Sequence, residues 1–165
     1  MPDHRGRRVA ALRGGFLSRA PLLGRDAYRA WTSITRRWGD ADRYRHVNNT
    51  VHYRWFDDAV NGWLIANGLL ELDGDGPIGL VVETGCRYAA PLDFPGTVEV
   101  GLLAEHVGTS SVRYRLGVFG DGQAEAAAEG HFVHVYVDRA SRRPQSLHRG
   151  FRDAVRRIGP SPGGR

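Results

Sequence analysis

The stretch TVHYRWFDDAVNGWLIAN, residues 50–67, decides the fold. Its apolar residues recur at helical spacing, and together they cover about half of a helix circumference. A helix with so broad an apolar face must be covered by a broad surface, which the rest of the chain can supply as a sheet. Gly68 is a suitable end for the helix. The apolar face consists of Tyr53, Trp55, Phe56, Ala59, Val60, Trp63, Leu64 and Ala66.

Strand-like segments flank this helix. Residues 28–38, YRAWTSITRRW, are rich in Trp, Thr and Ile and contain neither Gly nor Pro, which favours a strand. Four further runs follow the helix, and short Gly-containing connections predict that the last three are antiparallel neighbours joined by hairpins. The order predicts an α+β domain in which one long helix lies against an antiparallel sheet. The four runs are residues 79–90, 97–107, 111–119 and 124–138, and an amphipathic stretch at 147–158 predicts a short helix.

The chain of 165 residues has the size of one domain, and its 41% of apolar residues is enough for a single core. Its single cysteine, Cys86, cannot form an internal bridge, which excludes a disulfide-stapled secreted scaffold and predicts a reducing, cytoplasmic setting. No apolar run reaches the roughly 18 residues of a membrane span. We expect a basic, flexible N-terminal extension at 1–27, the folded domain at 28–144, and a basic C-terminal helix and tail at 145–165.

The charge is distributed unevenly along the chain. All 23 basic residues are arginine, and the net charge is +5. The basic excess lies at the two ends, in residues 1–25 and 139–165, whereas residues 26–138 are acidic overall. A nucleic-acid-binding domain would carry its positive charge on the folded body, so this distribution argues against nucleic acid as a partner.

The loop before the helix gathers more polar groups than a helix cap needs. Residues 38–49, WGDADRYRHVNN, contain two carboxylates, an imidazole and two carboxamides. A helix N-terminus offers unpaired N–H donors, which can hold an anion or polarise a carbonyl that gains charge during attack. A carboxylate a few residues earlier can return to the same place as a general base or nucleophile. The loop therefore predicts an acyl-transfer site.

At these residues the sequence resembles the hot-dog-fold acyl-CoA thioesterases of the 4-hydroxybenzoyl-CoA thioesterase type. The most specific match is Asp40-x-Asp42-x-x-x-His46-Val47-Asn48-Asn49, and further matches lie at residues 82–88, 91–96, 108–114 and 130–138. The resemblance implies one long helix wrapped by a curved antiparallel sheet of about five strands. It also implies a homodimer or homotetramer with sites between subunits. The implied reaction hydrolyses an acyl-CoA to a carboxylic acid and CoA without metal or cofactor, CoA being part of the substrate.

The resemblance assigns roles to the loop residues. Asp42 takes the part of base or nucleophile, and the backbone N–H near Asn49 polarises the thioester oxygen. His46 and Asn48 shape the loop or bind substrate. The residues also allow a structural interpretation, because Asp42 can form an Asx-turn and the two asparagines can cap the helix. Arg45 stands where such loops commonly have Gly, and a positive φ there would cost about 1 kcal/mol.

Other candidates lie outside the loop. Glu83 is expected either to pair with Arg87 on the same strand face or to assist the site of a partner subunit. Coenzyme A carries phosphates, which arginine forks suit. The resemblance therefore adds a sheet-end turn and residues beyond the last strand as substrate contacts: Ser110, Ser111, Arg142 and Arg143. His131 and His134 should point to opposite faces of a strand, so no metal site is expected from them.

Besides binding of nucleic acid or an anionic membrane by the Arg-rich chain ends, two other functions remain open from the sequence alone. One is a thioesterase that acts on acyl carrier protein, for which the basic chain ends could meet an acidic carrier. The other is a non-catalytic hot-dog protein that binds acyl-CoA or lipid and uses the Asp42 loop only as structure.

Overall fold

The computed structural model describes residues 20–160. Five strands and two helices follow one another along the chain, together with two short 3-10 turns at Arg25–Ala27 and Trp38–Asp40. Within this part of the chain, no helix is both long and apolar enough to cross a membrane. The elements are β1 (Ala30–Thr35), α1 (Asn49–Ala66), β2 (Ile78–Tyr88), β3 (Thr97–Val107), β4 (Ser111–Gly120), β5 (Ala128–Val137) and α2 (Arg149–Arg157).

The long helix α1 begins and ends where the sequence predicts. The Asn48 side chain caps its first turn, and Gly68 follows its end with a φ of 64°, a left-handed conformation that glycine adopts easily. The buried face of α1 matches the predicted apolar face only in part. Ala66 is exposed, whereas Val51 and His52 in the first turn are buried. The buried residues are Val51, His52, Trp55, Phe56, Ala59, Val60 and Leu64.

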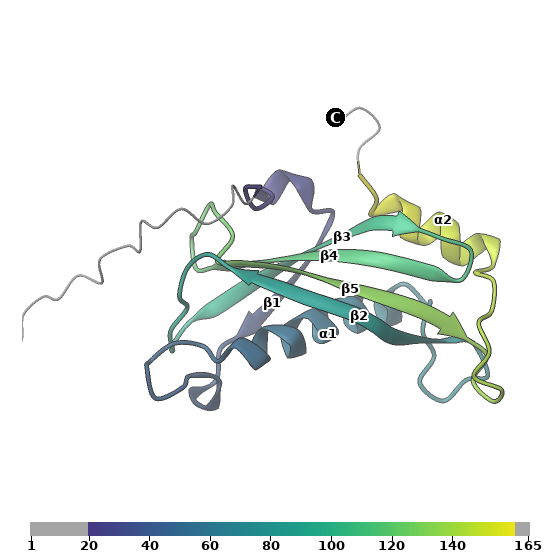
Figure 1. Cartoon of the computed structure of the whole chain (residues 1–165), viewed down its shortest axis with the longest axis horizontal. Helices are drawn as coiled ribbons and strands as arrows, with labels where there is room; N and C mark the ends of the chain where they lie inside the picture. The colour runs from purple at the N-terminus through teal and green to yellow at the C-terminus, as the bar shows by residue number, and fades with distance from the viewer. Residues whose placement is uncertain (1–19, 161–165) are drawn as a thin grey trace, which may run out of the picture.

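The strands form one antiparallel sheet in the order β1-β3-β4-β5-β2 (Figure 1). The predicted hairpins β3-β4 and β4-β5 are confirmed. β2 lies at the far edge, where it pairs with β5 from Ile78↔Val137 to Tyr88↔Ala128. β5 begins at Ala128 rather than at residue 124, because the carbonyl of Ala127 accepts the N–H groups of both Ala89 and Ala90 and the chain bends there.

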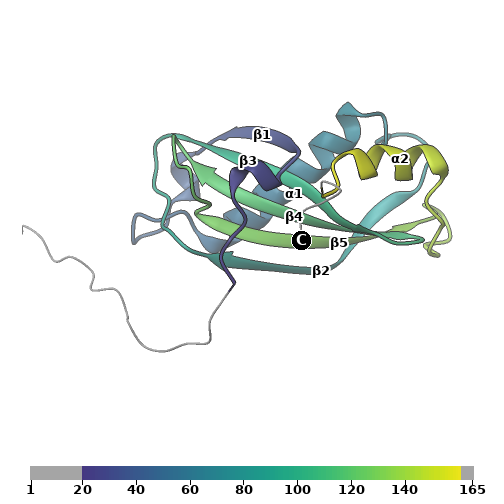
Figure 2. The ribbon, with the colours of Figure 1, turned by 90° about the horizontal axis from the view of Figure 1, so that it is seen from above.

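The two faces of the sheet are covered by different segments (Figures 1 and 2). α1 packs on one face, where its apolar side chains form the main core with the inward residues of β3, β4 and β5. α2 joins this core at the sheet end that contains the β3-β4 turn, since the Arg152 side chain donates to the carbonyl of Gly108. The Asp42 loop lies at the opposite end of the sheet, beside the end of β2.

Residues 20–28 cross the other face of the sheet (Figure 2). The Tyr28 ring lies on Gly101 and Gly117, which are opposite each other on β3 and β4. A Cβ at either glycine would come within 2.6 Å of the Tyr28 side chain, so only glycine lets Tyr28 approach this closely. Residues 20–27 also contact the folded domain, since Leu22 and Leu23 pack against the cluster that contains Tyr28 and the Leu23 N–H donates to Glu129. The expectation for residues 1–19 lies outside the described residues.

Candidate active site

The Asp42 side chain closes its own loop through one oxygen. Oδ1 accepts the N–H of Tyr44 at 2.7 Å and that of His46 at 3.4 Å, and the Asp42 N–H donates to the carbonyl of His46 at 2.8 Å. The turn requires Arg45 to adopt a φ of 61°, the positive value that the sequence marked as costly. The second oxygen, Oδ2, receives no donor from residues 20–160. The Asx-turn thus holds Asp42 in place and leaves half of the carboxylate open.

Asp40, two residues earlier, is almost fully buried and serves as an anchor. Its carboxylate accepts the N–H of Arg37 at 2.8 Å and pairs with the Arg54 guanidinium of α1. Burial raises the pKa of Asp40, but these hydrogen bonds outweigh it, and the pKa lies below its ordinary value. The Asp40 carbonyl also accepts the N–H of Asn48 at 2.8 Å. Asp40 therefore fixes the loop to the start of α1.

The start of α1 leaves one donor unused. Asn48 is the N-cap residue, and its Oδ1 accepts the Thr50 N–H at 3.0 Å and the Thr50 hydroxyl at 2.8 Å. Asn49 is the first helical residue, and no acceptor in residues 20–160 takes its backbone N–H. An open N–H at the positive end of an 18-residue helix is suited to a carbonyl oxygen that gains negative charge.

Asp42 stands between two hollows, which we name after a residue in each. The Trp38 hollow, of about 440 Å³, has an exposed tryptophan and two arginines in its wall, whereas the His52 hollow, of about 390 Å³, opens at the start of α1. The Trp38 hollow is lined by Trp38, Ala41, Asp42, Arg43, Arg45, Asp93 and Phe94. The His52 hollow is lined by Asp42, His46, Val47, Asn49, His52, Tyr88, Ala89, Ala90, Pro91 and Leu92.

His52 is the residue of this site that the sequence analysis missed. Its side chain is only 4% exposed, and its ring lies against those of Tyr88 and Trp55, with centroids 5.1 and 5.2 Å away. The helical period contains a signal for it, since residue 52 precedes Phe56 by four residues and so lies on the same buried face. A polar residue at a predicted core position, next to a predicted helix cap, is a functional candidate.

The remaining predicted substrate residues divide into near and far groups. His46 and Asn49 line the His52 hollow with Asp42, and Asn48 caps the helix beside it. Ser110 and Ser111 lie at the β3-β4 turn, and the exposed Arg142 and Arg143 follow β5 at the same end. β2 runs from this end of the sheet to the Asp42 loop, and at 3.3 Å per residue its length is about 30 Å. Within one chain these four residues therefore do not meet Asp42.

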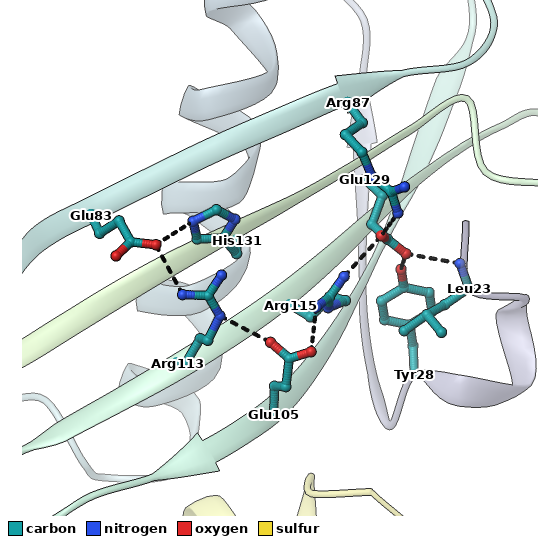
Figure 3. A network of polar contacts seen from close by, with 9 residues as sticks. All are labelled: Leu23, Tyr28, Glu83, Arg87, Glu105, Arg113, Arg115, Glu129 and His131. Atoms are coloured by element: carbon teal, nitrogen blue, oxygen red, sulfur yellow. Dashed lines mark hydrogen bonds and ion pairs between the residues drawn. The ribbon is translucent and has the colours of Figure 1, made fainter. Parts of the chain in front are cut away.

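Glu83 belongs to a polar network on the sheet face opposite α1 (Figure 3). It pairs with Arg113 and His131 at 2.9 Å each, while Arg87 pairs with Glu129 at 2.6 Å. The expected Glu83–Arg87 pair is therefore wrong. Four residues along a strand span about 13 Å, too far for an ion pair, whereas neighbouring strands are about 5 Å apart. The hydrogen bonds to Arg113 and His131 lower the pKa of Glu83.

The two strand histidines point to opposite faces, as predicted. His131 joins the polar network, and His134 is buried in the core, where both ring nitrogens lack a hydrogen-bond partner within residues 20–160. Burial lowers the pKa of His134 to about 4, so its ring is neutral near pH 7. No three metal-ligating side chains gather anywhere in the described part of the chain. The absence of a metal from the reaction stays a prediction.

The comparisons with known proteins agree with this architecture. Residues 36–155 match the thioesterase-like superfamily, and the chain belongs to that family. No curated protein matches the chain. Among solved structures, the PA5185 protein of Pseudomonas aeruginosa strain PAO1 is 46% identical, with a TM-score of 0.80 over 84% of this chain and 96% of its own. The hot-dog fold and the thioesterase family that the resemblance implied are confirmed.

Two further structures resemble the chain. The PA2801 protein of Pseudomonas aeruginosa is 30% identical, with a TM-score of 0.71 over 78% of this chain and 98% of its own. A thioesterase from Thermus thermophilus, solved in complex with coenzyme A and zinc, is 26% identical. Its TM-score is 0.68, over 81% of this chain and 96% of its own.

Proposed function

We propose that the protein hydrolyses an acyl-CoA thioester to a free carboxylic acid and CoA, with Asp42 as the base or nucleophile. One observation carries the proposal: the half-open carboxylate of Asp42 and the unused N–H of Asn49 line the same hollow. A thioester carbonyl whose oxygen approaches Asn49 would have its carbon accessible to Asp42 or to a water beside it. The helix start would then stabilise the negative charge that develops on that oxygen.

Coenzyme A as the thiol carrier is supported by two arginines. The second hollow beside Asp42 has Arg43 and Arg45 in its wall, with Asp93 paired to Arg45, and arginine forks suit the phosphates of CoA. The similar thioesterase of Thermus thermophilus was solved with coenzyme A bound. We therefore assign the Trp38 hollow to the thiol arm and the His52 hollow to the reacting carbonyl and the start of the acyl group.

A second copy of the chain would complete the site. β2 is an edge strand on which Val81 and Val82 are 45% and 61% exposed, and unpaired strand edges are ready to pair with another strand. Antiparallel pairing of two β2 strands would set the Ile78 end of one chain beside the Tyr88 end of the other. Arg142 and Arg143 of one subunit would then approach Asp42 of the other. This arrangement is the homodimer that we propose.

The test is thiol release from a panel of short, medium, long and aromatic acyl-CoAs, with wild type beside Asp42→Asn. The substitution keeps the shape and the carbonyl that accepts the Tyr44 N–H but removes the charge. We expect a loss of about a hundredfold or more in kcat/KM, with an unchanged melting temperature. Asp58→Asn, an exposed carboxylate on the outer side of α1, is the matched control and should retain full activity.

Two outcomes would contradict the proposal. Turnover that survives Asp42→Asn would move the chemistry away from this carboxylate. Hydrolysis of acyl-carrier-protein thioesters but not of the matched acyl-CoAs would identify the carrier protein as the true thiol arm.

A further inference from the structure

His52 has an unusual environment for a histidine beside a helix cap. The ring is held between Tyr88 at the end of β2 and Trp55 one turn along α1. Nδ1 is inaccessible to solvent and has no hydrogen-bond partner in the described chain, yet the residue lines the hollow that contains Asp42 and Asn49. Because Nδ1 is enclosed, Nε2 is the ring nitrogen that the hollow can reach.

The surroundings determine what Nε2 can do. Burial lowers the pKa of His52, although the backbone of Asn48 and Asn49 opposes this, so the ring is neutral near pH 7. The backbone groups of Asn48 and Asn49 that oppose burial are carbonyls, which can only accept from a ring N–H. We assign this N–H to Nδ1, the enclosed nitrogen, which forms no hydrogen bond of regular geometry with them. Nε2 then presents a lone pair to the hollow. It can accept a hydrogen bond but cannot hold an oxyanion.

Besides the His46 ring, the Asn49 side-chain amide and the Tyr88 hydroxyl, the lining of the hollow offers one donor and two acceptors on which the proposal rests. The donor is the Asn49 N–H, and the acceptors are the Asp42 carboxylate and His52 Nε2. A carbonyl oxygen needs the donor, whereas a water molecule has two protons to give and needs two acceptors. We propose that His52 positions the attacking water, which donates one proton toward Asp42 and the other to Nε2. This inference rests on the proposed function and selects its general-base form.

The step balances without any further reactant. The water oxygen forms a bond to the thioester carbon while one water proton passes to Asp42, and the carbonyl oxygen takes up the negative charge at Asn49. The C–S bond then breaks, the carbonyl re-forms, and the proton on Asp42 passes to the leaving thiolate. His52 keeps its own proton throughout and only orients the water, so it is a positioning residue.

The test compares His52→Phe with His52→Gln. Phenylalanine preserves the ring contacts with Tyr88 and Trp55 and removes the acceptor, whereas glutamine returns an acceptor oxygen to a similar place. We expect kcat of His52→Phe to fall about tenfold, the value of one hydrogen bond, with KM within about twofold on every acyl-CoA. His52→Gln should recover most of kcat. His106→Phe, at an exposed position on the far end of β3, is the matched control.

A labelling experiment tests the same inference independently. After a single turnover in H₂¹⁸O, direct attack by water leaves the Asp42 peptide unlabelled and puts ¹⁸O in the carboxylic acid product. Attack by Asp42 itself would form a mixed anhydride, and water attack on the Asp42 carbonyl of this anhydride would leave ¹⁸O in the Asp42 carboxylate. That result would overturn the proposal.

Other outcomes separate the two proposals. An unchanged kcat in His52→Phe, with active wild type, overturns only the role of His52. A loss confined to one class of acyl-CoA, or a raised KM, means that His52 binds the acyl group and also overturns it. Equal losses in both variants with a lowered melting temperature assign it to packing. No turnover by wild type on any ester overturns the proposed function itself.

Discussion

Glu129 and Asp42 are carboxylates in opposite circumstances. Glu129, on the face of the sheet away from α1, is 2% exposed and accepts four donors: the Leu23 N–H, the Tyr28 hydroxyl and the guanidiniums of Arg87 and Arg115 (Figure 3). Asp42 keeps one oxygen open, and beside it the Asn49 N–H and Nδ1 of His52 have no hydrogen-bond partner in the described chain. A fully satisfied polar cluster holds segments together, whereas an unsatisfied one is prepared for a ligand. Substitutions in the two regions should therefore affect different properties.

The largest effect on stability is expected at Glu129. Glu129→Gln removes a buried charge and leaves two guanidiniums, a backbone N–H and the Tyr28 hydroxyl with one neutral acceptor oxygen. We expect the free energy of unfolding to fall by about 4 kcal/mol, with kcat per folded molecule unchanged. Urea denaturation beside thiol-release assays measures both. Glu125→Gln, at an exposed position nearby, should change neither. A loss of kcat in folded Glu129→Gln would mean that the Glu129 cluster also affects catalysis, which would contradict the difference between the two regions.

His134 should produce a pH-dependent effect of about 3 kcal/mol, because its pKa is about 4 in the fold and 6.5 in the unfolded chain. Between these values the unfolded chain binds a proton that the folded chain does not, so stability falls as the pH falls from 6.5 to 4. Above pH 6.5 this contribution is constant. His134→Phe should reduce that slope to the part left by His52, whose pKa is also lowered by burial, while preserving the stacking on Phe132. Equal slopes in wild type and variant would exclude His134 as the source.

A variant of Asp40 tests whether this residue stabilises the loop while Asp42 acts in catalysis. Asp40→Asn weakens the hydrogen bonds from Arg37 and Arg54, and we expect a loss of about 2 kcal/mol in unfolding free energy. Since the pKa of Asp40 is lowered in the fold, this stabilisation is present above about pH 4 and is lost as the pH falls further. Thermal melts at pH 7 and pH 3 should therefore differ most for wild type. Asp42→Asn should leave the melting temperature unchanged, and the reverse pattern would exchange the two roles.

The smallest expected effect is a gain in stability when Arg45 is replaced. Arg45→Gly relieves a φ of 61° and should raise the free energy of unfolding by about 1 kcal/mol. Its ion pair with Asp93, at 3.8 Å on an exposed side chain, is worth little. Arg43→Gly is the control, because Arg43 has no positive φ and the change should not stabilise. A destabilised Arg45→Gly would mean that the arginine makes contacts worth more than its strain.

The local features of the fold could be predicted from sequence. The period of residues 50–67, the β3-β4 turn at 108–109, and the cap and stop of α1 are signals carried by adjacent residues, and the structure confirms them. The β4-β5 hairpin is also confirmed, although its connection extends from residue 121 to 127. The position of β2 beside β5 was not predicted, because the two strands lie far apart along the chain and no hairpin turn joins them. The packing of residues 20–28 on Gly101 and Gly117 gave no local signal at all.

Some residues of the candidate site could be predicted from the sequence, and others could not. The motif located Asp42, His46 and Asn49, which the fold brings into one hollow. It also indicated the positive φ at Arg45. His52 was missed because its importance comes from Tyr88, a residue of another element that encloses the ring. Ser110 and Arg142 could not be placed relative to Asp42, because their distance depends on the length of the sheet and on a second chain.

The pairing of β2 with β5 has a consequence for synthesis on the ribosome. Tyr88 pairs with Ala128, so β2 emerges about 40 residues before the first residue of its partner strand. At 5 to 20 residues per second, this corresponds to about 2 to 8 seconds in which the nascent strand has no neighbour. During that interval Leu80, Val81 and Val82 form an apolar edge on an incomplete chain. Nascent chains on neighbouring ribosomes would meet through the same edge that we propose for the mature dimer, which gives assembly an opportunity to begin before synthesis ends.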